Sequence, residues 1–200
     1  MRASAFSRPP LELGHYFPDW TSGVAALAAI AASEATLPSL LLRDPAETAA
    51  APTPDMPPER LAGYLGRVYG YRIDRVCRAT IGFGGTSWQV RRQRSRVGGL
   101  VRQHGGVAVG KQRDTPPTDR GAETREAFVP WSRLTDLRDG VLASAHQAFA
   151  LAGVRGTIRC RLSHAHHSGA RLRFAVAFGT AEPPPHWNLR QACLDQGVEV

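Results

Sequence analysis

The chain has 200 residues, a formal net charge of +8 and a single lysine, Lys111, among its 25 basic residues. This length allows one domain with a core of its own, and the arginine-rich charge fits either an anionic partner or a biased codon usage. Three cysteines, Cys77, Cys160 and Cys193, lie far apart and outside any C-x-x-C pair. This argues against a disulfide scaffold and a four-cysteine zinc site, and it predicts a reducing, cytoplasmic location. No apolar run reaches the roughly 20 residues of a membrane span, so no membrane partner is expected.

Residues 1–56 are expected to form a loosely ordered arm. Prolines and scattered aromatic residues without a regular period indicate extended chain over the first 20 residues. An alanine-rich helix, capped by Thr21 or Ser22, is expected to run to about Glu34. Residues 45–58 are rich in proline, alanine and threonine, which predicts a linker of polyproline character. At the other end of the chain, residues 181–200 are expected to form a tail.

Residues 57–180 are expected to form an α+β domain, an antiparallel sheet with packed helices. Its first part predicts a short amphipathic helix at 57–70, with apolar residues at helical spacing between a proline start and a glycine stop. A strand at 71–79 is expected next. Three glycines then break the chain, and alternation of apolar and polar residues up to Arg92 predicts a second strand. The glycines of this expected hairpin turn are Gly82, Gly84 and Gly85.

An arginine run follows the expected hairpin. Its members lie within six consecutive positions, and glycines dot the chain from there to Gly106. Such a run can neutralise the phosphates of a nucleic acid, or it can be a solvated loop. Aromatic residues usually interleave with arginines on a nucleic-acid surface, and none occurs between Trp88 and Phe128. The candidate nucleic-acid contacts are Arg91, Arg92, Arg94 and Arg96.

A short strand at Val107–Lys111, which delivers the single lysine, is expected to precede two helices. The first helix covers about residues 121–128 and carries Glu123 and Glu126. The second has one apolar face and ends at Gly153, a natural C-terminal stop. Its apolar face comprises Leu134, Leu137, Val141, Ala145 and Phe149.

The clearest β pattern lies near the end of the domain. Apolar residues alternate with arginines in 158–162 and again in 172–178, which predicts an antiparallel pair around a loop near Ser168. His164 and His166 are two positions apart, so on a strand they would face the same side, as a metal pair requires. No spacing singles out further ligands. We therefore expect exposed histidines and no metal.

One stretch resembles a known family. P-P-E-R-L-A-G-Y-L-G-R-V-Y-G-Y-R-I-D-R-V, followed by the glycine turn and W-Q-V-R, resembles the start of aminoglycoside-type small-molecule phosphotransferases over residues 57–92. The resemblance implies a kinase-like N-terminal lobe that binds ATP with magnesium. In such a lobe the glycine turn lies over the phosphates, Lys111 contacts them, and Glu123 or Glu126 pairs with the lysine. The implied nucleotide-site residues are Gly82, Gly84, Gly85, Thr86, Lys111 and Glu123.

The sequence departs from this family in its catalytic parts. It contains no H-x-D-x-x-x-x-N loop and no second metal-binding aspartate, so the resemblance predicts nucleotide binding and leaves catalysis open. The preferred hypothesis is a truncated or degenerate phosphotransferase-like protein. The alternative is an arginine-rich module that binds nucleic acid or another polyanion. A third is a protein without phosphate chemistry, whose reading frame departs from an ancestral kinase frame after Arg92.

Overall fold

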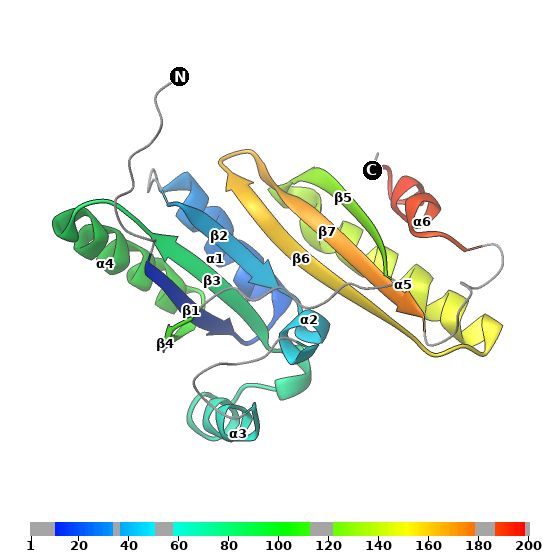
Figure 1. The fold of residues 1–200 in the computed structure, drawn as a ribbon, viewed down its shortest axis with the longest axis horizontal. Coiled ribbons are helices and arrows are strands. Elements are labelled where there is room, and N and C mark those ends of the chain that lie inside the picture. The colour runs from blue at the N-terminus through cyan, green and yellow to red at the C-terminus, as the bar shows by residue number, and fades with distance from the viewer. Residues whose placement is uncertain (1–10, 34–36, 51–57, 113–121, 179–186, 199–200) are drawn as a thin grey trace.

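A computed structural model describes residues 11–33, 37–50, 58–112, 122–178 and 187–198. These residues form a seven-stranded antiparallel sheet in the order β4-β1-β3-β2-β6-β7-β5, with helices against one face (Figure 1). The expected α+β class with an antiparallel sheet is therefore confirmed. The strands are β1 (Leu11–Phe17), β2 (Ser39–Arg43), β3 (Cys77–Phe83), β4 (Val107–Lys111), β5 (Glu123–Pro130), β6 (Gly156–His166) and β7 (Gly169–Phe178).

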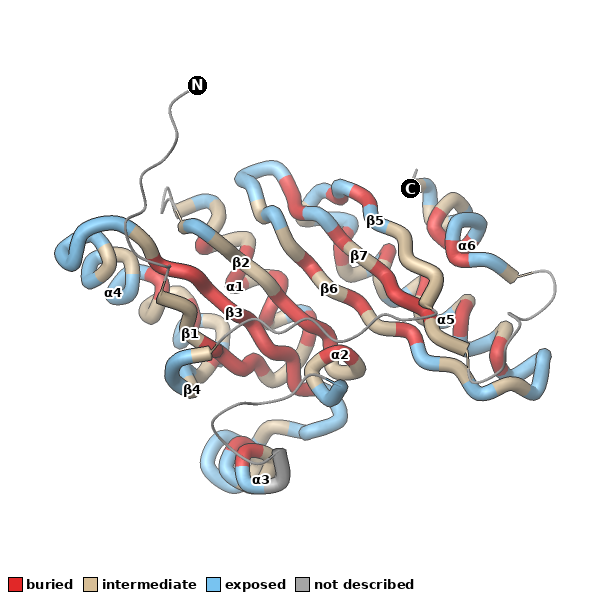
Figure 2. Tube along the Cα trace, viewed as in Figure 1, coloured by how far each residue is buried: buried red, intermediate tan, exposed pale blue. Residues whose placement is uncertain are grey.

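The main core lies between the sheet and the helices α1, α4, α5 and α6. Buried leucine, valine and phenylalanine side chains fill it, and β3 is buried along its whole length (Figure 2). The helices are α1 (Trp20–Ala32), α2 (Pro45–Ala50), α3 (Pro58–Tyr69), α4 (Ser87–Gln103), α5 (Leu134–Ala152) and α6 (Leu189–Asp195), with short 3-10 turns at Ile73–Arg75 and Trp131–Arg133.

A second, smaller core lies on the opposite face of the sheet. Leu61 and Leu65 of α3 pack there against Tyr16 of β1 and Val76, which precedes β3. Since the side chains of a strand alternate between the two faces, Tyr16 faces α3 while its neighbour Phe17 enters the main core. Helix α3 therefore covers one end of the second face and leaves the other end uncovered by the larger helices.

Several local expectations are confirmed. The amphipathic helix at 57–70 is α3, and the strand at Val107–Lys111 is β4. The predicted apolar face of α5 is buried, and the helix ends at Gly153 with φ of 64°. β6 and β7 pair antiparallel around a turn near Ser168. These segments have a strong hydrophobic period and clear end signals, which make them predictable from local sequence.

The first 56 residues contribute more structure than expected. β1 and β2 come from the segment that was expected to be a loose arm, yet both lie inside the sheet and pair with β3 on either side. Pro45–Ala50 was expected to be linker and is helix α2, whose first turn is capped by Asp44 through a 2.8 Å hydrogen bond from the Glu47 N–H. The expected tail contains α6, which packs against α5.

The expected glycine hairpin was wrong. The chain after the glycines is helix α4, because Thr86 and Gln89 form a capping box that starts it. Val97 and Val101, four positions apart, bury one side of this helix, and its arginines project from the other. The alternation around Trp88 covered too few positions to outweigh this helical signal.

The expected helix at 121–128 was also wrong. Its described residues belong to β5, in which Ala127 and Val129 are buried while Glu126 and Phe128 are exposed. That alternation has a period of two residues, which is the period of a half-buried strand.

Candidate functional site

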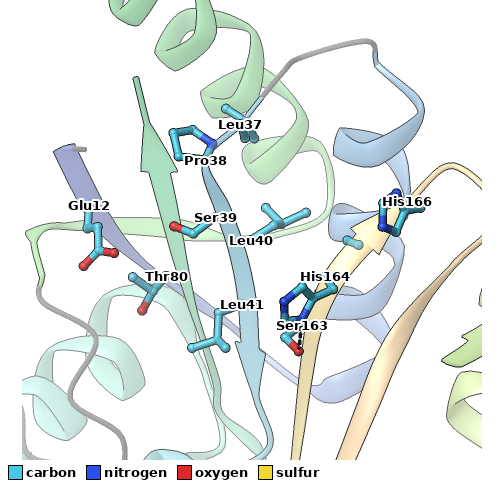
Figure 3. Close-up of a pocket in the computed structure, with 11 residues that line it drawn as sticks. Glu12, Leu37, Pro38, Ser39, Leu40, Leu41, Thr80, Ser163, His164 and His166 are labelled. Carbon is cyan, nitrogen blue, oxygen red and sulfur yellow. Dashed lines mark hydrogen bonds between the residues drawn. The ribbon is translucent and has the colours of Figure 1, made fainter. Parts of the chain in front are cut away.

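The uncovered part of the second sheet face holds a pocket of about 370 Å³ (Figure 3). Leu42 of β2 and Ile81 of β3 point into the main core, so the adjacent residues Leu41 and Thr80 point into this pocket. The apolar residues that line it are Leu37, Pro38, Leu40, Leu41 and Ala165. The polar lining residues are Glu12 of β1, Ser39 of β2, Thr80 of β3, and Ser163, His164 and His166 of β6.

Ser39 presents a buried hydroxyl in this pocket. Its Oγ makes no hydrogen bond with any described residue. Gly82 lies directly opposite Ser39 in the sheet, and a Cβ at Gly82 would overlap the Ser39 Oγ. The glycine therefore makes room for the hydroxyl. A buried hydroxyl without a partner costs stability.

His164 occupies an irregular point of the β6–β7 pair. The register shifts between Ser163 and His166, which leaves one extra residue on β6. Within the described chain, His164 is the one non-glycine residue with a positive φ, at 47°. Its Nδ1 lies 3.0 Å from the Ser163 Oγ. The bulge and this contact hold the imidazole at the pocket (Figure 3).

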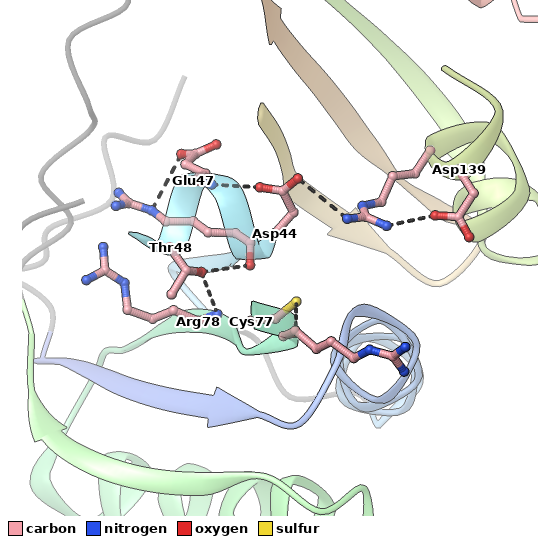
Figure 4. A network of polar contacts seen from close by, with 9 residues as sticks. Asp44, Glu47, Thr48, Cys77, Arg78 and Asp139 are labelled. Atoms are coloured by element: carbon pink, nitrogen blue, oxygen red, sulfur yellow. Dashed lines mark hydrogen bonds and ion pairs between the residues drawn. The ribbon is translucent and has the colours of Figure 1, made fainter. Parts of the chain in front are cut away.

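A buried ionic network lies at the other end of the same strands (Figure 4). Glu47 of α2 accepts a 2.6 Å hydrogen bond from the Arg161 Nε and lies 3.6 Å from the Arg43 Nε. Asp44 Oδ2 lies 3.6 Å from the Arg138 guanidinium of α5. Burial raises the pKa of Asp44 to about 6. This effect outweighs the hydrogen bond from the Glu47 N–H and the charge of Arg138, which both lower the pKa. These contacts connect β2, β6 and α5 and stabilise the fold.

Of the residues that were expected to form a nucleotide site, the structure separates Glu123 from the others, whereas Lys111 pairs with Leu13 of β1, which pairs on its other side with Ile81 beside Gly82. Gly82 is buried in β3, whereas Gly84 and Gly85 lead into α4. Thr86 caps α4: its backbone N–H donates to the Gln89 side chain at 2.7 Å, and its hydroxyl accepts from the Gln89 N–H at 3.3 Å. The capping box therefore already uses two amides of this turn.

The expected lysine–glutamate pair is not formed. Lys111 lies on β4 and Glu123 on β5, which are the two outermost strands of the sheet. Glu123 instead lies 3.2 Å from Arg125, and Glu126 lies 3.7 Å from Arg171. The physical reason is the sheet order, which places residues close in sequence at opposite edges.

The candidate nucleic-acid arginines lie on one helix. All four are exposed on α4, and the Arg92 guanidinium lies 5.5 Å from the centre of the Trp88 ring. The pocket lies away from this helix, on the other face of the sheet. The residues concerned are Arg91, Arg92, Arg94 and Arg96.

Comparison with known proteins identifies the fold. No protein-family model and no curated protein sequence matches the chain. An alkyldihydroxyacetonephosphate synthase has a similar structure, with a TM-score of 0.76 and 20% identity over 94% of this chain and 38% of its own. The 4-ethylphenol oxidase from Gulosibacter chungangensis, in complex with isoeugenol, has a TM-score of 0.54 and 11% identity over 94% of this chain and 42% of its own. The p-cresol methylhydroxylase with substrate bound has a TM-score of 0.54 and 14% identity over 94% of this chain and 43% of its own.

These similarities correct three expectations. The fold is similar to that of a synthase, an oxidase and a methylhydroxylase, so the kinase-like lobe inferred from residues 57–92 was wrong. The phosphotransferase-like function and the ATP–magnesium cofactor are contradicted with it, and the arginine-rich nucleic-acid or polyanion module is not supported. The chain spans 38% to 43% of the length of these proteins.

Sequence reasoning missed most of the pocket. Ser39 and Thr80 lie on strands whose neighbours come from distant parts of the chain, so no local motif marked them. His164 and His166 were singled out, but as a possible metal pair. In the described part of the chain no group of three or more metal-ligating side chains comes together, and no helix there is long and apolar enough to cross a membrane.

Proposed function

We propose that this chain forms one wall of the substrate site in an oxidase- or synthase-type enzyme that acts on a small organic molecule. The observation that carries the proposal is the pocket on the uncovered sheet face, in a fold shared with three such enzymes over 94% of the chain. The pocket volume of about 370 Å³ lies within the range of about 300–1,000 Å³ typical of small-ligand sites.

The pocket chemistry supports the same class of ligand. Leu41 supplies an apolar surface, and hydroxyl and imidazole groups lie around it (Figure 3). A small, mainly apolar molecule gains from burial against this leucine, while the few polar groups orient it. Two of the similar structures hold such a ligand by name, isoeugenol in one and the substrate of p-cresol methylhydroxylase in the other.

We further propose that the cofactor of the complete enzyme is a flavin, held by protein outside the described residues. The described residues do not fit a whole flavin dinucleotide. A glycine turn with open amides at the start of a helix is a common pyrophosphate site, and the turn before α4 uses amides in its capping box. The pocket also lies at the small end of the ligand-site range.

The test is a ligand titration of the 200-residue chain followed by amide chemical shifts. Isoeugenol, p-cresol and dihydroxyacetone phosphate are added separately, and at least one is expected to shift the amides of Ser39, Thr80 and His164. Leu41→Trp fills the pocket and should abolish the shifts. The matched control Trp88→Ala, on the exposed side of α4, should leave them intact. Shifts confined to the helical layer, or none, would contradict the proposal.

A second titration tests where the flavin binds. Flavin fluorescence is followed while the chain is added to FAD alone. We expect no quenching, since the described residues lack a dinucleotide site. Tight quenching that Thr86→Ala or Leu41→Trp abolishes would overturn the placement of the flavin outside this part of the protein.

A further inference from the structure

We infer that His164 is the residue of this pocket that hydrogen-bonds an oxygen of the ligand, and that its strained backbone is maintained to present the imidazole there. The inference rests on the proposed function, because it assigns a role within the same pocket. It also names a ligand class: a small molecule with an apolar body and an oxygen-bearing group such as a hydroxyl.

The backbone at His164 is unfavourable for a histidine. A φ of 47° lies in the left-handed region, where the Cβ of any L-residue crowds the backbone and where glycine is the most stable choice. Six of the chain's glycines adopt positive φ elsewhere in the described residues, so this chain uses glycine at such positions as a rule. Strain at a non-glycine residue is typical of functional sites, where the side chain must occupy a fixed place.

The strained backbone places the His164 imidazole in the pocket lining. Because the extra residue lies at position 164 or 165, His164 follows Ser163 into the pocket lining instead of alternating to the opposite face. The Ser163 hydroxyl lies 3.0 Å from Nδ1 and orients the ring. The other ring nitrogen, Nε2, then remains to donate to or accept from a ligand.

The rest of the pocket defines the ligand. Leu41 and His164 line the pocket from the adjacent strands β2 and β6 (Figure 3), so an apolar body placed on Leu41 brings its polar group to the imidazole. The Ser39 hydroxyl, which lacks a partner among the described residues, lies two positions before Leu41 on β2. His166 continues the polar edge along β6, although it does not share the strained backbone.

The experiment crosses protein variants with two probe ligands of nearly the same shape. The p-cresol probe carries a hydroxyl, and toluene is the same ring and methyl group without it. The parent chain should bind p-cresol more tightly than toluene. His164→Gly should weaken p-cresol binding by up to about tenfold, the loss expected for one hydrogen bond, and leave toluene binding unchanged. His164→Asn tolerates the same backbone and distinguishes loss of the ring from backbone effects.

Thermal unfolding gives a readout that does not depend on the ligand. His164→Gly should keep or raise the melting temperature, because glycine relieves the strain at this position. His167→Gly is the matched control, since it changes a neighbouring histidine in the turn that has no positive φ and does not line the pocket. It should lower the melting temperature slightly and leave both affinities unchanged.

The outcomes separate this inference from the proposed function. If neither probe shifts the pocket amides of the parent chain, the proposed function fails and this inference fails with it. If the parent binds p-cresol in the pocket and His164→Gly retains the full preference over toluene, only the role of His164 is overturned. An equal loss of p-cresol and toluene binding also overturns it, because that result indicates a change of pocket shape.

Discussion

Arg43 of β2 and Arg161 of β6 lie directly opposite each other in the sheet, and the Glu47 carboxylate contacts both of them. The row continues in both directions, with Arg78 opposite Arg43 and Arg173 opposite Arg161. Like charges directly across a sheet repel, so the centre of this row depends on the carboxylate that α2 inserts. Helix α2, expected from sequence to be a linker, therefore has a structural role.

Removing the charge of Glu47 is expected to destabilise the fold. Glu47→Gln leaves the buried Arg43 and the half-buried Arg161 without the carboxylate between them, and breaking such a pair costs about 3 kcal/mol of unfolding free energy. Urea unfolding measures the change. The matched control is Asp74→Asn, which removes an exposed carboxylate 3.0 Å from Arg72 and should leave the midpoint unchanged. Equal midpoints for the two variants would contradict a structural role for Glu47.

Two buried groups are expected to give opposite dependences of stability on pH. Burial raises the pKa of Asp44 to about 6, so the folded state holds its proton more tightly, and stability falls as pH rises from about 4 to 6. Burial lowers the pKa of His15 to about 4, so stability rises with pH from about 4 to 6.5. The parent chain should therefore show a weak net dependence between pH 4 and 6.

Single variants should separate the two slopes. Asp44→Asn keeps an acceptor for the Glu47 N–H and leaves the His15 effect, so its stability should rise with pH across this window. His15→Gln should show the reverse. The slope for one group approaches at most about 1.4 kcal/mol per pH unit, measured as urea midpoints at several pH values. Parallel pH profiles for the two variants would refute the assignment of opposite pH slopes to Asp44 and His15.

Gly82 and Ser39 are expected to be coupled. Gly82→Ala places a Cβ against the Ser39 Oγ and should lower stability by about 1–3 kcal/mol, as other overpacked sites do. Ser39→Ala removes that oxygen, so the double variant should recover most of the loss. A double-mutant cycle in urea measures the coupling. Additive effects would show that the two residues do not touch in solution.

A variant of Thr86 tests whether the chain around Trp88, which was expected to be a strand, is the start of helix α4. Thr86→Ala removes half of the capping box and should cost about 1 kcal/mol, with faster amide exchange in the first turns of α4. Ser95→Ala, at an exposed position within the same helix, is the control and should have a small effect. Uniform strand-like protection around Trp88 would contradict the helix.

Much of the fold follows from local pattern, and the errors have identifiable physical causes. The apolar face of α5 and the alternation in β6 and β7 each span enough residues to define a period. Around Trp88 the alternation was short, and the side chain–backbone contacts of Thr86 and Gln89 decided for a helix. At Glu123 the strand had no period in the sequence, because Ala127, Phe128 and Val129 are all apolar and their alternation between buried and exposed positions arises from pairing with β7.

The candidate site was far less accessible from sequence. Its residues come from β1, β2, β3 and β6, and two of these strands lie in a segment without a clear β period. The two histidines were visible, yet their role depends on a bulge that is defined only by pairing with β7. The phosphate-site interpretation of Gly82 rested on local sequence, whereas the space around a glycine depends on the strand that pairs with it.

By itself, the sequence determined the α+β class, the helices with clear caps and apolar stripes, and the β6–β7 pair, because these depend on interactions within a few residues or one turn. The tertiary structure alone decided the order of the strands, the pocket they enclose and the separation of Lys111 from Glu123. Strand order is set by burial and pairing between distant segments, and such contacts leave no spacing signature in the chain.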